Sequence, residues 1–123
     1  MTRSKGKTVV VIDDDDDVSD VLGGLLEIYD YPVKTYPSAQ DFIADASVEP
    51  GCLVLDQNMP GMSGLDLIAS LISEHHPIPT VLITGDPGAE LTGRAEQLGV
   101  TKVLSKPMSH RELIREVEAC LRS

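Results

Sequence analysis

The sequence is poor in basic residues and in long apolar runs, and each shortage excludes a class of protein. Its 123 residues include 10 Lys and Arg against 20 Asp and Glu, a formal net charge of -10 at pH 7. Nucleic-acid binding needs clustered Lys and Arg, so we expect no direct contact with nucleic acid. No apolar run is long enough to span a bilayer, and the start, MTRSKGK, lacks the apolar segment of a signal peptide. We therefore expect a soluble, cytoplasmic protein without membrane contact.

Cysteine is also scarce. Cys52 and Cys120 have neither the number nor the spacing of a disulfide framework or a metal site, so we interpret both as small buried hydrophobic residues. A chain of this length fits one domain and can bury about two thirds of its unfolded surface. No linker or internal repeat is visible, and we expect residues 1–123 to form a single domain.

Two hydrophobic periods alternate along the chain. Short apolar runs predict five strands, at 8–12, 32–36, 52–55, 79–83 and 100–104. Helical spacing predicts five helices between and after them, at 18–29, 39–46, 65–74, 90–98 and 110–121. Ser38 and Ser109 are the expected N-caps of the second and fifth helices. Val21 and Ile28 are expected on the apolar face of the first helix, and Phe42 and Ile43 are expected to point inward from the second.

This alternation predicts an α/β fold. Four of the strands are almost continuous Val, Leu and Ile, which is typical of a parallel sheet covered by helices on both faces. The strand at 32–36 alternates and carries Lys34, so we place it at an edge. With right-handed crossovers, the expected architecture is a doubly wound, flavodoxin-like sheet of five parallel strands in the order 2-1-3-4-5, with five helices. Ligands bind such sheets at the carboxyl ends of the strands, where the strand order reverses.

The residues at those strand ends carry chemistry: Asp13, Asp14, Asp56, Thr84 and Lys106. Three converging carboxylates raise one another's pKa unless a cation lies between them. Mg²⁺ prefers oxygen ligands and binds through one or two carboxylates and a phosphate. The lysine and the threonine hydroxyl suit the oxygens of a phosphoryl group, and an aspartate can act as the nucleophile that accepts it.

Four short motifs in this order resemble a known family. They are Asp13-Asp14, DQNMPGMSG from Asp56 to Gly64, ITG from Ile83 to Gly85, and SKP from Ser105 to Pro107. Each motif is weak alone, but each follows the appropriate strand. The chain resembles, over essentially all of its length, the response-regulator receiver domains of two-component signal transduction, the CheY-like superfamily.

The resemblance implies a role for each residue at the metal site. Asp56 resembles the phosphoacceptor of the family and also a ligand of Mg²⁺. Asp14 resembles the acid that ligates the metal directly, and Asp13 the acid that binds it through water. Asn58 would contribute its backbone carbonyl to the metal.

The resemblance also implies how the phosphoryl group is held and what it does. Thr84 would hydrogen-bond one phosphoryl oxygen and Lys106 would pair with another, while Pro107 occupies the position of a cis-proline. The partner would be a histidine kinase or a phosphotransfer protein. Phosphorylation would switch the surface formed by the fourth helix, the fifth strand and the fifth helix, for a protein partner, a homodimer or an output domain. Such a domain is a signalling switch, not an enzyme.

The run of five aspartates, residues 13–17, exceeds what the site needs. For Asp15, Asp16 and Asp17 we favour an ordinary role at the start of the first helix, where acids interact well with the helix dipole and Asp17 caps the helix. The alternative is that Asp15 or Asp16 touches the metal through water or meets a basic residue of a partner.

One departure from the family pattern leaves the function open. Receivers usually carry Tyr or Phe three residues before the lysine, and Val103 stands there, so the usual aromatic switch cannot operate. A signal would leave through the backbone and the fourth helix, which Gly88 and Gly93 weaken. The first alternative to a phosphorylation switch is a degenerate receiver that binds partners without phosphorylation. The second is a small phosphatase using Asp13 and Asp15. The chain is either a stand-alone receiver or the N-terminal part of a longer regulator.

Overall fold

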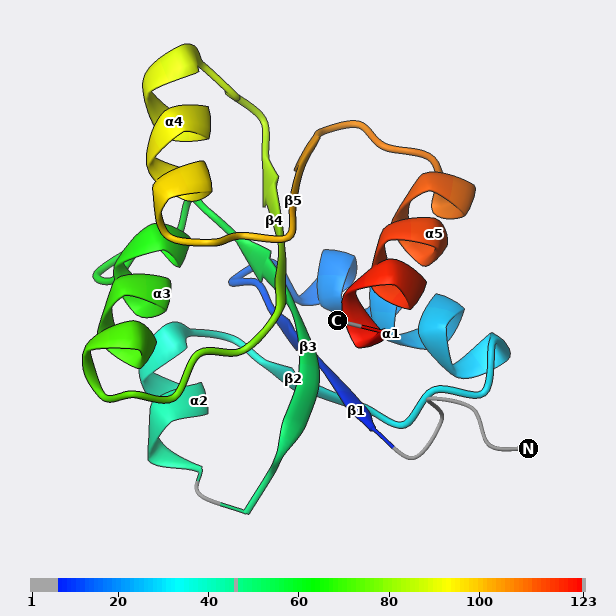
Figure 1. Cartoon of the computed structure of the whole chain (residues 1–123). Coiled ribbons are helices and arrows are strands. Elements are labelled where there is room, and N and C mark those ends of the chain that lie inside the picture. The colour runs from blue at the N-terminus through cyan, green and yellow to red at the C-terminus, as the bar shows by residue number, and fades with distance from the viewer. Residues whose placement is uncertain (1–6, 46, 123) are drawn as a thin grey trace.

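The computed structural model describes residues 7–45 and 47–122, in which strands and helices alternate from β1 to α5 (Figure 1). The strands are β1 (Thr8–Ile12), β2 (Val33–Tyr36), β3 (Pro50–Asp56), β4 (Thr80–Thr84) and β5 (Lys102–Ser105). The helices are α1 (Asp16–Ile28), α2 (Ala39–Ala44), α3 (Gly64–Ser73), α4 (Ala89–Gln97) and α5 (His110–Leu121). Six residues of the start MTRSKGK, from which the lack of a signal peptide was predicted, lie outside the described residues.

The sheet is entirely parallel and has the strand order β2-β1-β3-β4-β5, which confirms the predicted fold class. β2 lies at an edge, as the alternating pattern around Lys34 indicated. The register pairs Ile12 with Leu55, and Asp56 with Ile83. The carboxyl ends of the central strands are therefore level with one another, and the residues that follow them meet along one edge of the sheet.

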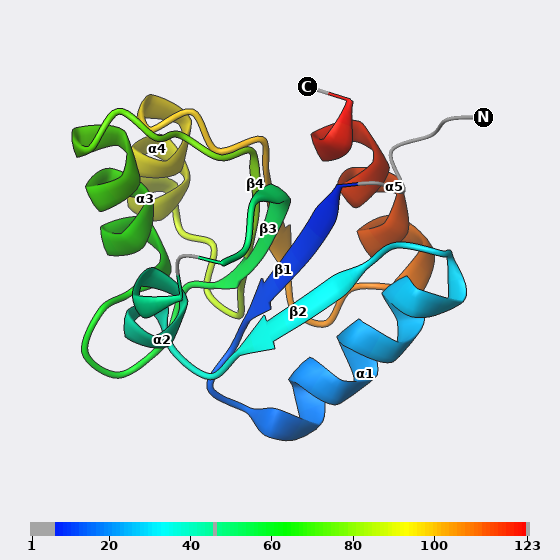
Figure 2. The same ribbon diagram turned by 90° about the horizontal axis from the view of Figure 1, so that it is seen from below.

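Helices cover both faces of the sheet. Figure 2 shows α1 and α5 on one side of the strands and α2, α3 and α4 on the other. Successive residues of β1 point to opposite faces: Val9 and Val11 pack with α1 and α5, and Val10 and Ile12 pack with the other three helices. Because both faces are buried, the central strands are continuous apolar runs without polar alternation.

The apolar face of α1 is narrower than predicted. Leu22 and Leu26 are buried, but Val21 is 56% exposed and Ile28 is 77% exposed, so their predicted inward placement is wrong. Val21 and Ile28 are seven residues apart and share one side of the helix, about 100° around from Leu22. The sheet contacts only the side that carries Leu22 and Leu26.

The second helix is shorter than predicted. It ends at Ala44, and Asp45 is its C-cap, while Ala46, the predicted last residue, lies outside the described residues. Phe42 is buried as expected, but Ile43 is 50% exposed, contrary to the prediction. A helix of six residues has room for one buried side, and Ala39 and Phe42 occupy it.

Other local predictions hold. Ser38 and Ser109 each accept a hydrogen bond of 3.0 Å from a first-turn N–H, as N-caps do. Cys52 and Cys120 are both buried and free. Most remaining element ends differ from the predicted ones by one or two residues. Across the described ranges, no helix combines the length and the apolar character that crossing a membrane requires.

A polar network ties the connection after α2 to the edge strand. The Tyr36 hydroxyl donates to Asp45 Oδ2 at 2.7 Å, and the backbone N–H and hydroxyl of Ser47 donate to Asp45 Oδ1 at 2.9 and 2.6 Å. Lys34 Nζ lies 3.6 Å from Oδ2. These bonds hold the pKa of Asp45 well below its usual range. Burial, together with the bond to Asp45, raises the pKa of Tyr36 to about 12.

The network predicts a pH-dependent loss of stability in Asp45→Asn. An amide cannot accept all the hydrogen bonds of the carboxylate, so the variant should unfold at lower urea concentration at neutral pH. Because folding lowers the pKa of Asp45, its contribution is complete above 3.8, the ordinary value, and fades as the pH falls below it. The difference from wild type should therefore shrink below about pH 4. Asp20→Asn, an exposed change on α1, is the control, and an equal loss there would contradict the assignment.

Candidate functional site

Three carboxylates meet at the carboxyl ends of two neighbouring strands. Asp13 and Asp14 directly follow β1, and Asp56 is the last residue of β3. Each offers an oxygen, and these oxygens all lie within 4.8 Å of one another. Asp13 and Asp56 are each only 4% exposed, while Asp14 is open to solvent. The predicted convergence of the acids is confirmed.

Backbone and side-chain groups hold Asp13 in place. Its N–H donates to the carbonyl of Tyr36 at 3.2 Å, and its Oδ1 accepts the N–H of Asp15 at 2.9 Å. The Ser19 hydroxyl donates to its backbone carbonyl at 3.4 Å. Burial raises the pKa of Asp13, the bond from Asp15 opposes that shift, and the charge of Asp56 adds to it. The site therefore crowds negative charge around two carboxylates that are largely shielded from water.

The rest of the aspartate run belongs to the first turn of α1. Asp15 is the N-cap, because its Oδ1 accepts the N–H groups of Asp17 at 3.0 Å and Val18 at 3.3 Å. The prediction that Asp17 caps the helix is therefore wrong: α1 starts at Asp16, earlier than the apolar pattern indicated. Asp16 and Asp17 lie in the first turn, where the helix dipole favours acids. A water-mediated contact of Asp15 or Asp16 with a metal stays a prediction.

Lys106 supplies the positive charge of the site. It follows β5, and its Nζ lies 3.1 Å from Asp56 Oδ1. Its backbone N–H donates to the carbonyl of Thr84, the buried last residue of β4, at 2.9 Å. The Thr84 hydroxyl accepts the N–H of Asp86 at 3.1 Å. The Lys106–Pro107 bond is cis, as the family resemblance implied.

The donor set fits a hard divalent cation. The three acids offer only oxygen, which Mg²⁺ prefers. Asp56 Oδ1 is fully buried and accepts no hydrogen bond among the described residues, although it pairs with Lys106. A buried carboxylate oxygen in that state has a lone pair available for a metal. Asn58 lies two residues after Asp56 and is exposed. That its backbone carbonyl binds the metal stays a prediction.

The connection from β3 to α3 is closely constrained. Gly61 has φ of 84°, a left-handed conformation that favours glycine. Gly64 opens α3 where a Cβ atom would lie 2.9 Å from the Asp56 carbonyl oxygen and 2.8 Å from Leu82 Cδ1. The side chain of Gln57 accepts the N–H of Leu65 at 2.9 Å. Sequence reasoning missed Gln57, because no local pattern marks a glutamine that caps a helix seven residues later.

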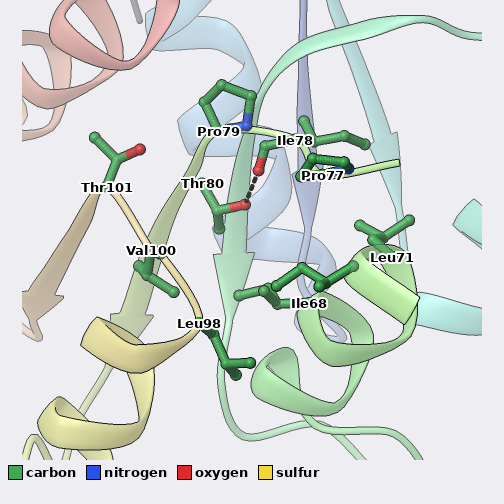
Figure 3. A pocket seen from close by; sticks show the side chains of 11 residues that line it. Ile68, Leu71, Pro77, Ile78, Pro79, Thr80, Leu98, Val100 and Thr101 are labelled. Atoms are coloured by element: carbon green, nitrogen blue, oxygen red, sulfur yellow. Dashed lines mark hydrogen bonds between the residues drawn. The ribbon is translucent and has the colours of Figure 1, made fainter. Parts of the chain in front are cut away.

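A separate pocket lies at the opposite end of β4. It measures about 400 Å³, and α3, the connection after it and the connection from α4 to β5 line it (Figure 3). The Thr80 hydroxyl inside it donates to the Ile78 carbonyl at 2.8 Å. No lining residue is charged. Thr80 and Thr84 begin and end a five-residue strand and are about 13 Å apart, so the pocket and the carboxylates lie at opposite ends of the strand.

Comparison with known proteins identifies the arrangement. Residues 9–118 match the family model described as the response regulator receiver domain. The chain is 36% identical over 115 residues to the transcriptional regulatory protein TdiR of Thauera aromatica, covering 93% of this chain and 51% of that protein. It is 37% identical over 114 residues to the transcriptional regulatory protein FixJ of Azorhizobium caulinodans, covering 92% and 54%. The chain thus spans about half the length of these curated relatives.

The solved structures agree. The crystal structure of FixJ-N superposes with a TM-score of 0.87 and 31% identity, covering 99% of this chain and 96% of that one. A CheY-like receiver domain from Methanospirillum hungatei has the same TM-score at 21% identity, which shows the shared fold alone.

The contact between β3 and α3 predicts the effect of Gly64→Ala. The added methyl group meets the backbone of Asp56, which cannot move without displacing the carboxylate, so unfolding free energy should fall by about 1–3 kcal/mol. Gly24→Ala is the matched control, because nothing lies within 4 Å of a Cβ atom there and alanine is the better helix former. Urea unfolding of both variants measures the difference. Equal stability of the two would refute the close-contact explanation.

Proposed function

We propose, from the premise that this chain belongs to the response regulator receiver domain family, that Asp56 accepts a phosphoryl group and thereby switches the domain. The chain is the receiver domain of a two-component response regulator, and such a domain is a signalling switch, not a classical enzyme. One observation carries the proposal for Asp56: its buried carboxylate lies within 4.8 Å of the oxygens of two other acids and 3.1 Å from Lys106.

The proposed reaction is a phosphoryl transfer to a carboxylate. A two-component receiver implies a histidine kinase as partner, and we propose that this kinase or a phosphotransfer protein presents a phosphohistidine. A carboxylate oxygen of Asp56 forms a bond to phosphorus while the P–N bond to the histidine breaks and the imidazole takes up the electron pair. The ammonium group of Lys106, which pairs with Asp56, then forms an ion pair with a phosphoryl oxygen and stabilises its negative charge.

A divalent cation completes the charge balance. The acidic triad of Asp13, Asp14 and Asp56 is typical of the receiver magnesium site, and we propose that Asp14 ligates the ion directly and Asp13 through water. Bound Mg²⁺ would neutralise the acids and stabilise charge on the phosphoryl oxygens. Asp13 and Asp14 would hold the ion beside Asp56, and the carbonyl of Asn58 is the proposed backbone ligand.

The proposed switch starts at Thr84. Its hydroxyl accepts a hydrogen bond from the N–H of Asp86. To donate to a phosphoryl oxygen it turns toward Asp56, and the connection from β4 to α4 follows. α4 suits such movement, because its N-cap, Gly88, makes no side-chain hydrogen bond and only Ala95 among its residues is buried. Val103 is half-buried and has no ring to rotate, so we assign the signal to α4 and the neighbouring β5 and α5 surface.

The output of the switch is proposed more broadly. The two curated relatives named above are transcriptional regulatory proteins about twice as long, which supports a role for this chain as the receiver part of a regulator of transcription. We propose that phosphorylation promotes either a homodimer or release of an output domain through α4, β5 and α5. A stand-alone receiver remains the alternative. The cytoplasmic location of the protein stays a prediction.

The proposal predicts that Asp56→Ala abolishes phosphorylation. The protein is incubated with a small-molecule phosphodonor and Mg²⁺, and intact mass is measured. Wild type should gain one phosphoryl group, and excess chelator should prevent the gain because the acids then repel the incoming phosphate. Asp56→Ala should gain none, since the variant lacks the buried carboxylate that lies 3.1 Å from Lys106.

Asp20→Ala on α1 is the control and should be phosphorylated like wild type. A phosphoryl group that persists in Asp56→Ala and maps to Asp13 would overturn the proposal in favour of a phosphatase. A wild type that gains none would overturn it in favour of a receiver that binds partners without phosphorylation.

A further inference from the structure

Gln57, the residue after the proposed phosphoacceptor, is bonded in three directions. Its N–H donates to the carbonyl of Ile83 in β4 at 2.9 Å. Its carbonyl accepts the N–H of Gly64 at 3.0 Å, and its side-chain Oε1 accepts the N–H of Leu65 at 2.9 Å. Gln57 therefore joins the end of β3 both to the neighbouring strand and to the start of α3.

These bonds supply what the first turn of α3 lacks. The leading N–H groups of a helix have no partner within the helix. Gln57 satisfies two of them, those of Gly64 and Leu65, while the Ser63 hydroxyl accepts the third from Asp66 at 3.2 Å. The connection between Gln57 and Gly64 is thus closed at its base by a residue seven positions upstream.

The closed connection includes the next residue along the chain, Asn58. Asn58 is exposed, and neither its backbone nor its side chain forms a hydrogen bond with another of the described residues. The direction of its carbonyl depends on how firmly its neighbours are held. On one side, Gln57 is fixed by the three bonds above, and on the other, Met59 is buried among the residues under α3. Of the three bonds, only the one from the N–H of Leu65 to the Gln57 side chain can be removed by a substitution that leaves the backbone groups of Gln57 in place.

We propose that Gln57 is a positioning residue for the metal site, which it supports by fixing the segment from Asp56 to Asn58 against α3. The inference rests on the proposed function, because it assumes that Mg²⁺ binds between Asp13, Asp14 and Asp56. Gln57 does not touch the ion: its Oε1 faces the N–H of Leu65. Its effect is to hold the carboxylate and the carbonyl in the binding arrangement before the ion arrives, so that binding does not have to order the loop.

The test is the Mg²⁺ affinity of wild type and of Gln57→Met. It is measured by titrating each protein with Mg²⁺ and recording the amide chemical shifts in ¹H–¹⁵N NMR spectra. Methionine matches glutamine in length but accepts hydrogen bonds only weakly. We expect the Kd for Mg²⁺ to rise about fivefold, which corresponds to about 1 kcal/mol. Gln57→Glu keeps an acceptor for Leu65 and should bind at least as tightly as wild type.

Ser63→Ala is the matched control. It removes a different cap from the same helix, the Ser63 hydroxyl that accepts the N–H of Asp66, and it leaves the backbone N–H of residue 63 able to donate to the Asp66 carboxylate. It should lower the stability of the domain about as much as Gln57→Met but leave the Kd for Mg²⁺ within about twofold of wild type, since it leaves both bonds to Gln57 intact. Circular dichroism confirms that each variant is folded at the titration temperature. If Gln57→Met unfolds, Gln57→Asn, too short to reach Leu65, takes its place.

The outcomes separate the inference from the proposed function. Unchanged affinity in Gln57→Met, or an equal loss in Ser63→Ala, would overturn the positioning role and leave phosphorylation of Asp56 standing. A wild type that binds no Mg²⁺ but still gains a phosphoryl group would overturn the metal step and the inference together. Selective weakening in Gln57→Met with recovery in Gln57→Glu supports the inference.

Discussion

The crowding of three carboxylates at one edge of the sheet is the constraint on which the rest of the site depends. Asp13 and Asp56 are almost fully buried, and their oxygens and one of Asp14 lie within 4.8 Å of one another. Like charges at that separation repel strongly where water is excluded. Lys106 compensates part of the charge, and the N–H of Asp15 another part. The remaining negative charge is what a divalent cation would balance.

The fold brings these charges together because its strands are parallel and in register. β1 and β3 are neighbours although α1, β2 and α2 lie between them in the sequence, so Asp13 and Asp56 meet across the sheet. β4 and β5 continue the series and bring Thr84 and Lys106 to the same edge. Helices on both faces bury the apolar residues of the three central strands, on which the acids and Thr84 are carried. The helix that follows β1 also directs the positive end of its dipole toward the acids.

The two connections that leave this edge differ in how many contacts support them. The connection from β3 to α3 is held by Gln57 and by the close approach of Gly64 to the backbone of Asp56. The connection from β4 to α4 has less support: Gly88 offers no side-chain cap, and α4 buries one residue. A group bound at Asp56 would therefore lie between a well-supported connection and a less supported one. This division offers a route for a signal in a chain that has Val103 in place of an aromatic ring.

The sequence alone determined the fold class, the strand order and the convergence of the three acids, because those depend on strong local signals. Continuous apolar strands require two covered faces, and charged residues after them require a common edge. The sequence did not determine that Asp15 rather than Asp17 caps α1, that Val21, Ile28 and Ile43 are exposed, or that Gln57 closes the loop beside Asp56. Each of these depends on which side of a helix the sheet contacts, or on a bond between residues distant along the chain. Only the tertiary structure decides such contacts, because hydrophobic periodicity indicates that a residue is apolar but not whether a neighbour is there to cover it.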